Sequence, residues 1–305
     1  MSILITGGAG TLAGDFLDYW QENAIDEELI LLDNLSQSVV ESTEISAANI
    51  RLLRIDCTET QTVVELFAKY QPRAVLHFAS TMDSSDFGFN SNIQTLLATL
   101  IAAEKTSRPI IFFPQSFLSR NCSESIADES LIEPELGEYP LFKSLCEIYL
   151  RAYSGKSVAG IISTTLSPRL SIGPIPAFIK RLLGGQAISI SDTSRDYISP
   201  SAVVTAILLT LEESFEEETV VIASGTSKAT KDIYHSVSAQ LNISRDPEPG
   251  VTPPGPGDPR EILLVPSKKL IDVGWNPLMN LDSALINCIN AVKTSTTSIR
   301  QHHIK

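Results

Sequence analysis

The stretch MSILITGGAGTLAG, residues 1–14, decides the fold of this chain. Its residues 2–6 are a short apolar run with no charged neighbour, which is typical of a buried strand. The glycine-rich turn GGAG follows directly at residues 7–10, and the apolar stretch from Leu12 to Trp20 is compatible with a helix. A strand, a glycine turn and a helix in this order are the context in which such a motif indicates dinucleotide binding.

Each small residue of this turn has a task in binding a pyrophosphate. Gly7 lets the chain turn tightly, and Gly10 lets the backbone approach the anion. The helix that starts at Thr11 and Leu12 then offers its free N–H groups to the anion. The spacing is Gly7-x-x-Gly10-x-x-Ala13, and alanine is acceptable at the third position, which needs only close packing of helix and strand. An ordinary tight turn is the alternative.

A carboxylate at the end of the second predicted strand favours the dinucleotide interpretation. This strand, Leu29 to Leu32, is followed by Asp33, about 20 residues past the glycines, where a carboxylate binds both ribose hydroxyls of an adenosine. A carboxylate at this position repels a 2′-phosphate, and no arginine follows it. The sequence therefore predicts NAD rather than NADP.

Composition limits the classes of partner. The 305 residues suffice for one large α/β domain, or for a domain with an added lobe. The net charge of −13 argues against nucleic acid and against an anionic membrane surface. No signal peptide or apolar run of about 18 residues is recognisable. The four scattered cysteines are typical of reduced thiols in a cytoplasmic protein; they are Cys57, Cys122, Cys146 and Cys288.

Strands and helices alternate through the first half of the chain. The predicted strands are Ser2–Thr6, Leu29–Leu32, Asn49–Ile55, Ala74–Phe78, Ile110–Phe113 and Val158–Thr165. The predicted helices are Leu12–Trp20, Glu59–Tyr70, Asn92–Lys105 and Glu138–Tyr153. This alternation predicts an α/β Rossmann fold, a doubly wound parallel sheet with right-handed crossovers.

The pattern changes at PRLSIGPIP, residues 168–176, whose prolines and glycine are typical of a lobe boundary. Beyond it we expect a polar extended stretch at 189–199 and a loop at 246–259. A strand at 219–223 and helices at 178–183, 230–241 and 281–292 complete the prediction. We therefore expect an NAD-binding domain over 1–167, to which 199–226 returns, and a smaller substrate-binding lobe formed mainly by 168–305. The histidines at 302 and 303 are expected to be part of a solvated tail, and no metal site is expected.

Tyr139 and Lys143 form a Y-x-x-x-K pair, one helical turn apart and on one face of a predicted helix. The helix precedes the sixth predicted strand, so the pair faces the strand ends that hold the cofactor. A lysine ammonium favours the phenolate and lowers the tyrosine pKa from about 10. Tyr139 would then act as general base toward a substrate hydroxyl and as acid on the return. An ordinary surface pair is the alternative.

Ser116 follows the fifth predicted strand. Its hydroxyl would share a hydrogen bond with the same substrate oxygen as Tyr139. A loop serine that caps a turn is the alternative.

These motifs together resemble the extended short-chain dehydrogenase/reductase family, the group of nucleotide-sugar epimerases and dehydratases. The likeness covers nearly the whole chain and includes LLDNLS at 31–36, VLHFAS at 75–80, YPLFK at 139–143, RDYI at 195–198 and GWNP at 274–277. The stretch 168–186 resembles the epimerase-like branch encoded in bacterial O-antigen clusters.

The resemblance implies roles for further residues around the cofactor. The adenosine ribose would be held by residues at the end of the second strand, which are Asp33, Asn34 and Leu35. Asp56 and Cys57 would flank the adenine. The wall of the pyrophosphate and nicotinamide would be formed by Phe78, Ala79 and Ser80, supported by Asn92, with Tyr139 and Lys143 also at the cofactor.

The resemblance also implies substrate contacts. The family's substrate-side Asn corresponds to a position near Thr164, and Ser116 would contact the reacting hydroxyl, although Gln115 is the alternative there. Arg195 would pair with a nucleotide diphosphate, a charge-assisted contact that suits arginine. A surface pair of Arg195 with Asp196 is the alternative.

The residues after Ser116 narrow the choice of reaction. In the family's 4,6-dehydratases and uronate decarboxylases a carboxylate follows the catalytic hydroxyl, whereas Phe117 and Leu118 stand there in this chain. Reductases usually favour NADPH, against which Asp33 argues. We therefore expect 4-epimerisation of a nucleotide sugar, UDP-linked, through a transient 4-keto intermediate.

Other interpretations stay open at this point. One is a dehydrogenase, reductase or dehydratase acting on a nucleotide sugar or another alcohol, and another is an NAD-binding sensor without catalysis. The apolar helices at 92–105 and 138–153 are expected to pair in a homodimer.

Overall fold

The computed structural model of the chain describes residues 2–41, 44–45, 47–81, 86–116, 126–127, 138–216, 218–248, 251–252 and 261–302. For 86–87, 126–127, 138–140, 251–252 and 295–302 it describes the backbone alone. Phe117, Leu118, Cys122 and His303, which entered the sequence argument, lie outside the described residues, as does the side chain of Tyr139.

The main sheet confirms the predicted doubly wound α/β fold. Its strands run in the order β11-β7-β5-β4-β1-β2-β3, and every neighbouring pair is parallel. The strands are β1 (Ser2–Thr6), β2 (Glu28–Asp33), β3 (Ile50–Arg54), β4 (Ala74–His77), β5 (Ile110–Ser116), β7 (Ser157–Ile162) and β11 (Thr219–Ile222). The order reverses between β1 and β4, which is where such sheets bind ligands outside the carboxyl ends of their strands.

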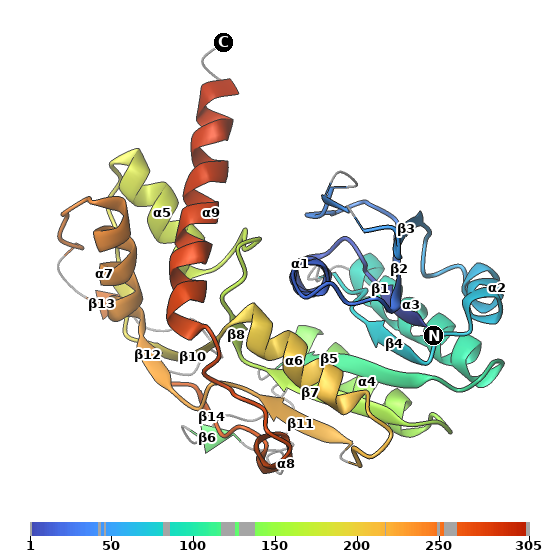
Figure 1. Cartoon of the computed structure of the whole chain (residues 1–305). Helices are drawn as coiled ribbons and strands as arrows, with labels where there is room; N and C mark the ends of the chain where they lie inside the picture. The colour runs from blue at the N-terminus through green and yellow to red at the C-terminus, as the bar shows by residue number, and fades with distance from the viewer. Residues whose placement is uncertain are drawn as a thin grey trace.

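Helices cover both faces of this sheet (Figure 1). On one face lie α1 (Thr11–Glu22) and α6 (Pro200–Thr210), whose apolar side chains pack with Ile3, Ile5 and Leu31. On the other face lie α2 (Thr60–Tyr70), α3 (Asp86–Glu104) and α4 (Glu138–Arg151). Because both faces are covered, β1 and β4 are buried at every position, as their mostly apolar sequences predict.

Two elements differ from the prediction. The prediction of one strand over 158–165 is wrong. The strand β7 ends at Ile162, which is the last residue that pairs with β11, and residues 164–165 pair instead with Tyr197 and Ile198. The helix α6 was missed, although Ser199 caps it by accepting a hydrogen bond from the Ala202 N–H and Pro200 starts it. Its apolar residues lack helical periodicity because the helix is buried nearly all round.

The C-terminal part builds a second, smaller core beside the sheet (Figure 1). It is formed by α5 (Pro174–Gly184), α7 (Thr230–Leu241) and α9 (Leu281–His302), and α9 is longer than predicted. The accompanying short elements are β6 (Ile126–Ala127), β8 (Thr164–Thr165), β9 (Ile190–Ser191), β10 (Ser194–Ile198), β12 (Ser227–Ala229), β13 (Val251–Thr252), β14 (Leu263–Leu264) and α8 (Lys268–Asp272). Among the described residues, no helix has both the length and the apolar character needed to cross a bilayer.

Candidate functional site

The glycine turn after β1 lies directly against the segment after β4. Gly7 has φ +67°, and a Cβ atom on it would lie 2.6 Å from the Ala79 nitrogen and 2.8 Å from the Phe78 carbonyl carbon. A Cβ on Gly8 would lie 2.6 Å from the Leu31 Cβ. A side chain at Gly7 would push the turn away from the segment after β4, and one at Gly8 would push it away from β2. Glycine therefore leaves only backbone atoms at the point where the strand order reverses.

The N-terminus of α1 opens from this turn and fits an anion. Gly10 is the residue before the helix, and it donates from its N–H to the Gly7 carbonyl at 3.1 Å. No described side chain caps the helix, and its first turn, which begins with Thr11 and Leu12, contains no acidic residue. The N–H groups and the positive end of the helix dipole therefore suit a pyrophosphate.

Asp33 joins the glycine turn to the end of β2. Its Oδ2 accepts a hydrogen bond from the Ala9 N–H at 2.9 Å, and its Oδ1 accepts one from the Leu35 N–H at 2.7 Å. Leu35 has φ +62°, and the exposed Asn34 accepts hydrogen bonds from Ser36. Each carboxylate oxygen has further lone pairs, so Asp33 can hold its backbone contacts and still accept ribose hydroxyls.

The two residues predicted to flank adenine lie differently. Asp56 is exposed, and its Oδ1 accepts hydrogen bonds from the N–H and hydroxyl of Thr58 before α2. Cys57 is buried under the glycine turn, where burial raises its thiol pKa to about 12 even though the Gly7 N–H bonds to it. Cys57 is thus an unreactive part of the wall beneath the turn.

Asn92 ties the segment after β4 to α3. Its Oδ1 accepts from the Thr81 N–H at 2.7 Å, and its Nδ2 donates to the Thr81 carbonyl at 2.9 Å. This pair of hydrogen bonds holds the segment Phe78–Thr81, in which Ser80 is exposed, beside the glycine turn. That Asn92 thereby supports the cofactor wall stays a prediction.

His77 was not singled out from the sequence, although it is the one polar residue in the strand AVLH. It is buried at the end of β4, and its Nδ1 lies 3.0 Å from the Thr6 hydroxyl and 3.1 Å from that of Thr99. Burial, with a smaller effect of Lys143, lowers its pKa to about 3. His77 is therefore a neutral link between β1, β4 and α3.

Lys143 reaches from α4 to the end of β5. Its Nζ donates to the Pro114 carbonyl at 2.9 Å and lies 4.5 Å from the centre of the Phe113 ring. The residue is only 3% exposed, and burial lowers its pKa to about 8. Tyr139 lies one turn earlier in α4, so the spacing of the pair holds in the backbone, while contact of its ring with Lys143 stays a prediction.

The Gln115 side chain is engaged in contacts between α4 and β5. It is buried, and its Nε2 donates to the Lys143 carbonyl and to Glu147 Oε2, both at 3.0 Å. Its Oε1 accepts from the Ser116 N–H at 3.1 Å. Gln115 thus clamps α4 to β5, and Ser116 as the catalytic hydroxyl stays a prediction. Glu147, four residues after Lys143, is a part of this clamp that the sequence analysis missed.

The predicted substrate residues Thr164 and Arg195 lie in the three-stranded sheet β12-β10-β8. Thr164 pairs with Tyr197, and Arg195 lies opposite Lys228 and donates to the Ser194 carbonyl at 2.8 Å. Their contact with a substrate stays a prediction.

Asp196 has a structural role of its own. It is buried, its carboxylate accepts from the Ser224 N–H and hydroxyl and from the Gly225 N–H, and burial raises its pKa. The Asp196 carboxylate is therefore engaged with Ser224 and Gly225, while the choice between a diphosphate contact and a surface position for Arg195 stays open.

Gly7, Asp33, Asn92 and Lys143 all lie at the carboxyl edge of one sheet. The close approach at Gly7, the open helix end and the carboxylate at Asp33 fit NAD, whose pyrophosphate would lie on the α1 N-terminus and whose ribose would meet Asp33. This fold and site define an NAD-dependent enzyme of the extended short-chain dehydrogenase/reductase type. The chain belongs to the NAD dependent epimerase/dehydratase family, whose model matches residues 3–223, and NAD is its cofactor.

Known proteins resemble the chain over nearly its full length. It is 24% identical to the dTDP-4-dehydro-6-deoxyglucose reductase of Escherichia coli, covering 95% of this chain and 97% of the relative. It is also 24% identical to the UDP-glucose 4-epimerase of Rhizobium meliloti (strain 1021), covering 92% and 93%. The crystal structure of the Bordetella bronchiseptica enzyme WbmG in complex with NAD is 25% identical, with a TM-score of 0.85 over 97% of this chain and 95% of that one.

Proposed function

We propose that the chain catalyses 4-epimerisation of a UDP-linked sugar, as an enzyme of carbohydrate biosynthesis. The observation that carries the proposal is the buried Lys143, held by Pro114 and Gln115 at the end of β5 on the sheet edge that also holds the glycine turn and Asp33. Relatives named UDP-glucose 4-epimerase support the choice of substrate class.

The roles of the chain's own residues follow from this placement. Held by the α1 N-terminus and Asp33, NAD would supply the hydride acceptor and the hydride donor that inversion at C4 of the sugar needs. Tyr139 takes the proton of the C4 hydroxyl, and the Lys143 ammonium favours its phenolate. Ser116 hydrogen-bonds the same oxygen, and Arg195 binds the diphosphate. Residues 1–167 and 199–226 bind the cofactor, and the remainder of 168–305 binds the substrate together with Thr164.

Two features disfavour neighbouring reactions. A 4,6-dehydratase needs an acid and a base after the catalytic hydroxyl, and neither Phe117 nor Leu118 can transfer a proton. A reductase that releases oxidised cofactor suits NADPH, whose 2′-phosphate the Asp33 carboxylate repels. A 4-epimerase needs only one base, one hydride acceptor and room for the sugar to turn.

The reaction is tested in three incubations of the purified protein, each with NAD and one sugar nucleotide. The sugar nucleotides are UDP-glucose, UDP-N-acetylglucosamine and UDP-xylose. We expect one of these to equilibrate with its C4 epimer, seen by NMR, without net accumulation of NADH. A stable 4-keto-6-deoxy or decarboxylated product, or stoichiometric NADH formed from a small alcohol, would contradict the proposal.

A second copy of the chain is the proposed partner of the outer face of α3 and α4. These two helices pack side by side, and they expose the large apolar side chains Ile101, Leu141, Ile148 and Tyr149. Ile148, 63% exposed, is the most open of them. Exposed apolar side chains on two helices that pack side by side suit helix-to-helix contact across a two-fold axis.

Replacing Ile148 by Asp is expected to convert the dimer into a monomer, because the carboxylate would be buried without a partner at the interface. Light scattering after size-exclusion chromatography measures the mass. Ile286→Asp, at an exposed apolar position on α9, is the matched control and should leave the dimer intact. An unchanged mass for Ile148→Asp would exclude this interface.

The cysteines support a reducing, cytoplasmic location. Cys57, Cys146 and Cys288 are buried free thiols. Free thiols are typical of proteins in a reducing compartment such as the cytoplasm, where disulfides rarely form.

A further inference from the structure

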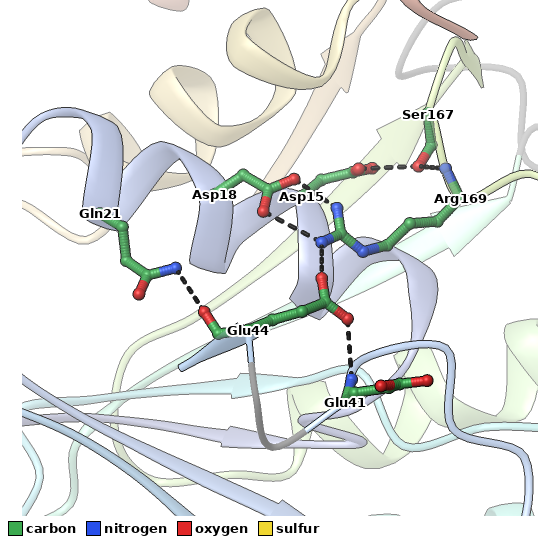
Figure 2. Close-up of polar contacts among 7 residues, drawn as sticks. All are labelled: Asp15, Asp18, Gln21, Glu41, Glu44, Ser167 and Arg169. Atoms are coloured by element: carbon green, nitrogen blue, oxygen red, sulfur yellow. Dashed lines mark hydrogen bonds and ion pairs between the residues drawn. The ribbon is translucent and has the colours of Figure 1, made fainter. Parts of the chain in front are cut away.

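Arg169 lies where the chain leaves the main sheet for the C-terminal part, and its side chain reaches back to α1 (Figure 2). Its guanidinium donates to both carboxylate oxygens of Asp18, at 3.0 Å for Oδ1, and also to the carboxylate of Glu44. The side chain is only 13% exposed. A planar guanidinium can hold two carboxylates at once in a fixed geometry, which a lysine cannot.

A second contact anchors the same segment to α1. The Ser167 hydroxyl donates to Asp15 Oδ1 at 2.7 Å and accepts from the Arg169 N–H at 3.1 Å. Ser167 and Asp15 are both buried, and a Cβ on Gly14 would lie 2.6 Å from the Arg169 Cδ. The segment is therefore closely fitted to the helix that follows the glycine turn.

From Glu44 the contacts lead to the glycine turn itself. Glu44 Oε1 accepts from the Glu41 N–H at 2.8 Å, and its carbonyl accepts from the Gln21 side chain at 3.1 Å (Figure 2). The N–H groups of Val39 and Val40 donate to the Ala9 carbonyl at 2.8 and 3.1 Å. Ala9 is thus held on one side by this segment and on the other by Asp33.

We propose that Arg169 is a positioning residue for NAD: by holding Glu44 against α1, it keeps residues 39–41 on Ala9 and so fixes the turn that binds the pyrophosphate. Arg169 acts through other residues and touches no reacting atom. Because it belongs to the segment that leads into the C-terminal part, it also links that part to the cofactor site. The proposal depends on NAD as cofactor and not on which reaction the enzyme catalyses.

The test compares NAD binding by the cofactor-free forms of the unmodified chain, four single variants and one double variant. We expect Arg169→Gln to raise the Kd for NAD about 2- to 30-fold, the range found for residues that act through a contact network. Arg169→Lys should have a smaller effect, because the charge remains while one carboxylate contact is lost. Arg51→Gln, which breaks an exposed ion pair between Arg51 on β3 and Glu28 on β2, is the matched control and should leave the Kd unchanged.

Glu44→Gln separates positioning from simple charge attraction. If Arg169 only attracted the NAD anion, removing the negative charge of Glu44 would tighten NAD binding. Positioning predicts the opposite, a weaker affinity for NAD. It also predicts that the double variant binds NAD no more weakly than Arg169→Gln alone, because both changes break the same contact between Arg169 and Glu44. Hydrogen exchange of residues 7–10 should also be faster in both single variants.

Two results would overturn the proposal. One is an unchanged Kd and unchanged hydrogen exchange in a folded Arg169→Gln protein. The other is tighter NAD binding by Glu44→Gln. Circular dichroism verifies folding, and if Arg169→Gln does not fold, Arg169→Lys and Glu44→Gln decide by the same measurements.

Discussion

Tyr139→Phe is expected to lower kcat for 4-epimerisation by about 10²- to 10⁴-fold, the usual contribution of a general acid–base group. The substitution removes only the phenolic oxygen, so α4 and its contacts through Lys143 and Gln115 should persist. NAD should therefore still bind. Steady-state product analysis measures kcat, and titration of the cofactor-free protein measures the Kd for NAD.

Tyr149→Phe provides the control for this prediction. Tyr149 lies on the same helix, is 41% exposed, and loses the same hydroxyl in the substitution. Its turnover should equal that of the unmodified chain. If Tyr139→Phe turned over as fast as the unmodified chain, Tyr139 would not be the general base. The role proposed for Lys143 would then be contradicted as well.

Gly7→Ala is expected to weaken NAD binding strongly and to destabilise the fold. The new Cβ would lie 2.6 Å from the Ala79 nitrogen, in backbone that cannot give way as a flexible side chain would. Forcing a methyl group into such a contact costs about 1–3 kcal/mol in unfolding free energy. The displaced turn should weaken NAD binding by roughly 100-fold, equivalent to about 2.7 kcal/mol. Urea unfolding and NAD titration measure the two effects.

Gly185→Ala separates the close contact from backbone strain. Gly185 has φ +65°, nearly the same as Gly7 at +67°, but the nearest atom to its Cβ position is 3.8 Å away. Both variants meet the same strain in the left-handed region, roughly 1–2 kcal/mol. Only Gly7→Ala should bind NAD much more weakly than the unmodified chain. Normal NAD affinity in Gly7→Ala would contradict the placement of the cofactor at this turn.

Local chemistry made the cofactor half of the site predictable. The apolar strand, the GGAG turn and the helix occupy consecutive residues, and Asp33 follows a strand of the same repeating pattern. The sheet then brings these residues together because the carboxyl ends of parallel strands share one edge. The spacing of Tyr139 and Lys143 was equally accessible, since four residues make one helical turn.

Tertiary packing decided what local pattern could not. The strand β7 ends at Ile162 because its partner β11 ends there. The hydrogen bonds of Gln115 to Lys143 and Glu147 depend on how α4 packs on β5. A buried amide satisfies its hydrogen bonds with whatever groups the fold brings near, and no local pattern names those groups.

The sequence by itself determined a parallel α/β sheet, its glycine turn and its choice of NAD, because each of these depends on residues close together in the chain. Only the tertiary structure decided that Arg169 meets Glu44, 125 residues earlier, and Asp18, 151 residues earlier. An arginine in a proline-rich stretch carries no local sign of its partner. Which carboxylates it neutralises depends on the surfaces that hydrophobic packing places against each other.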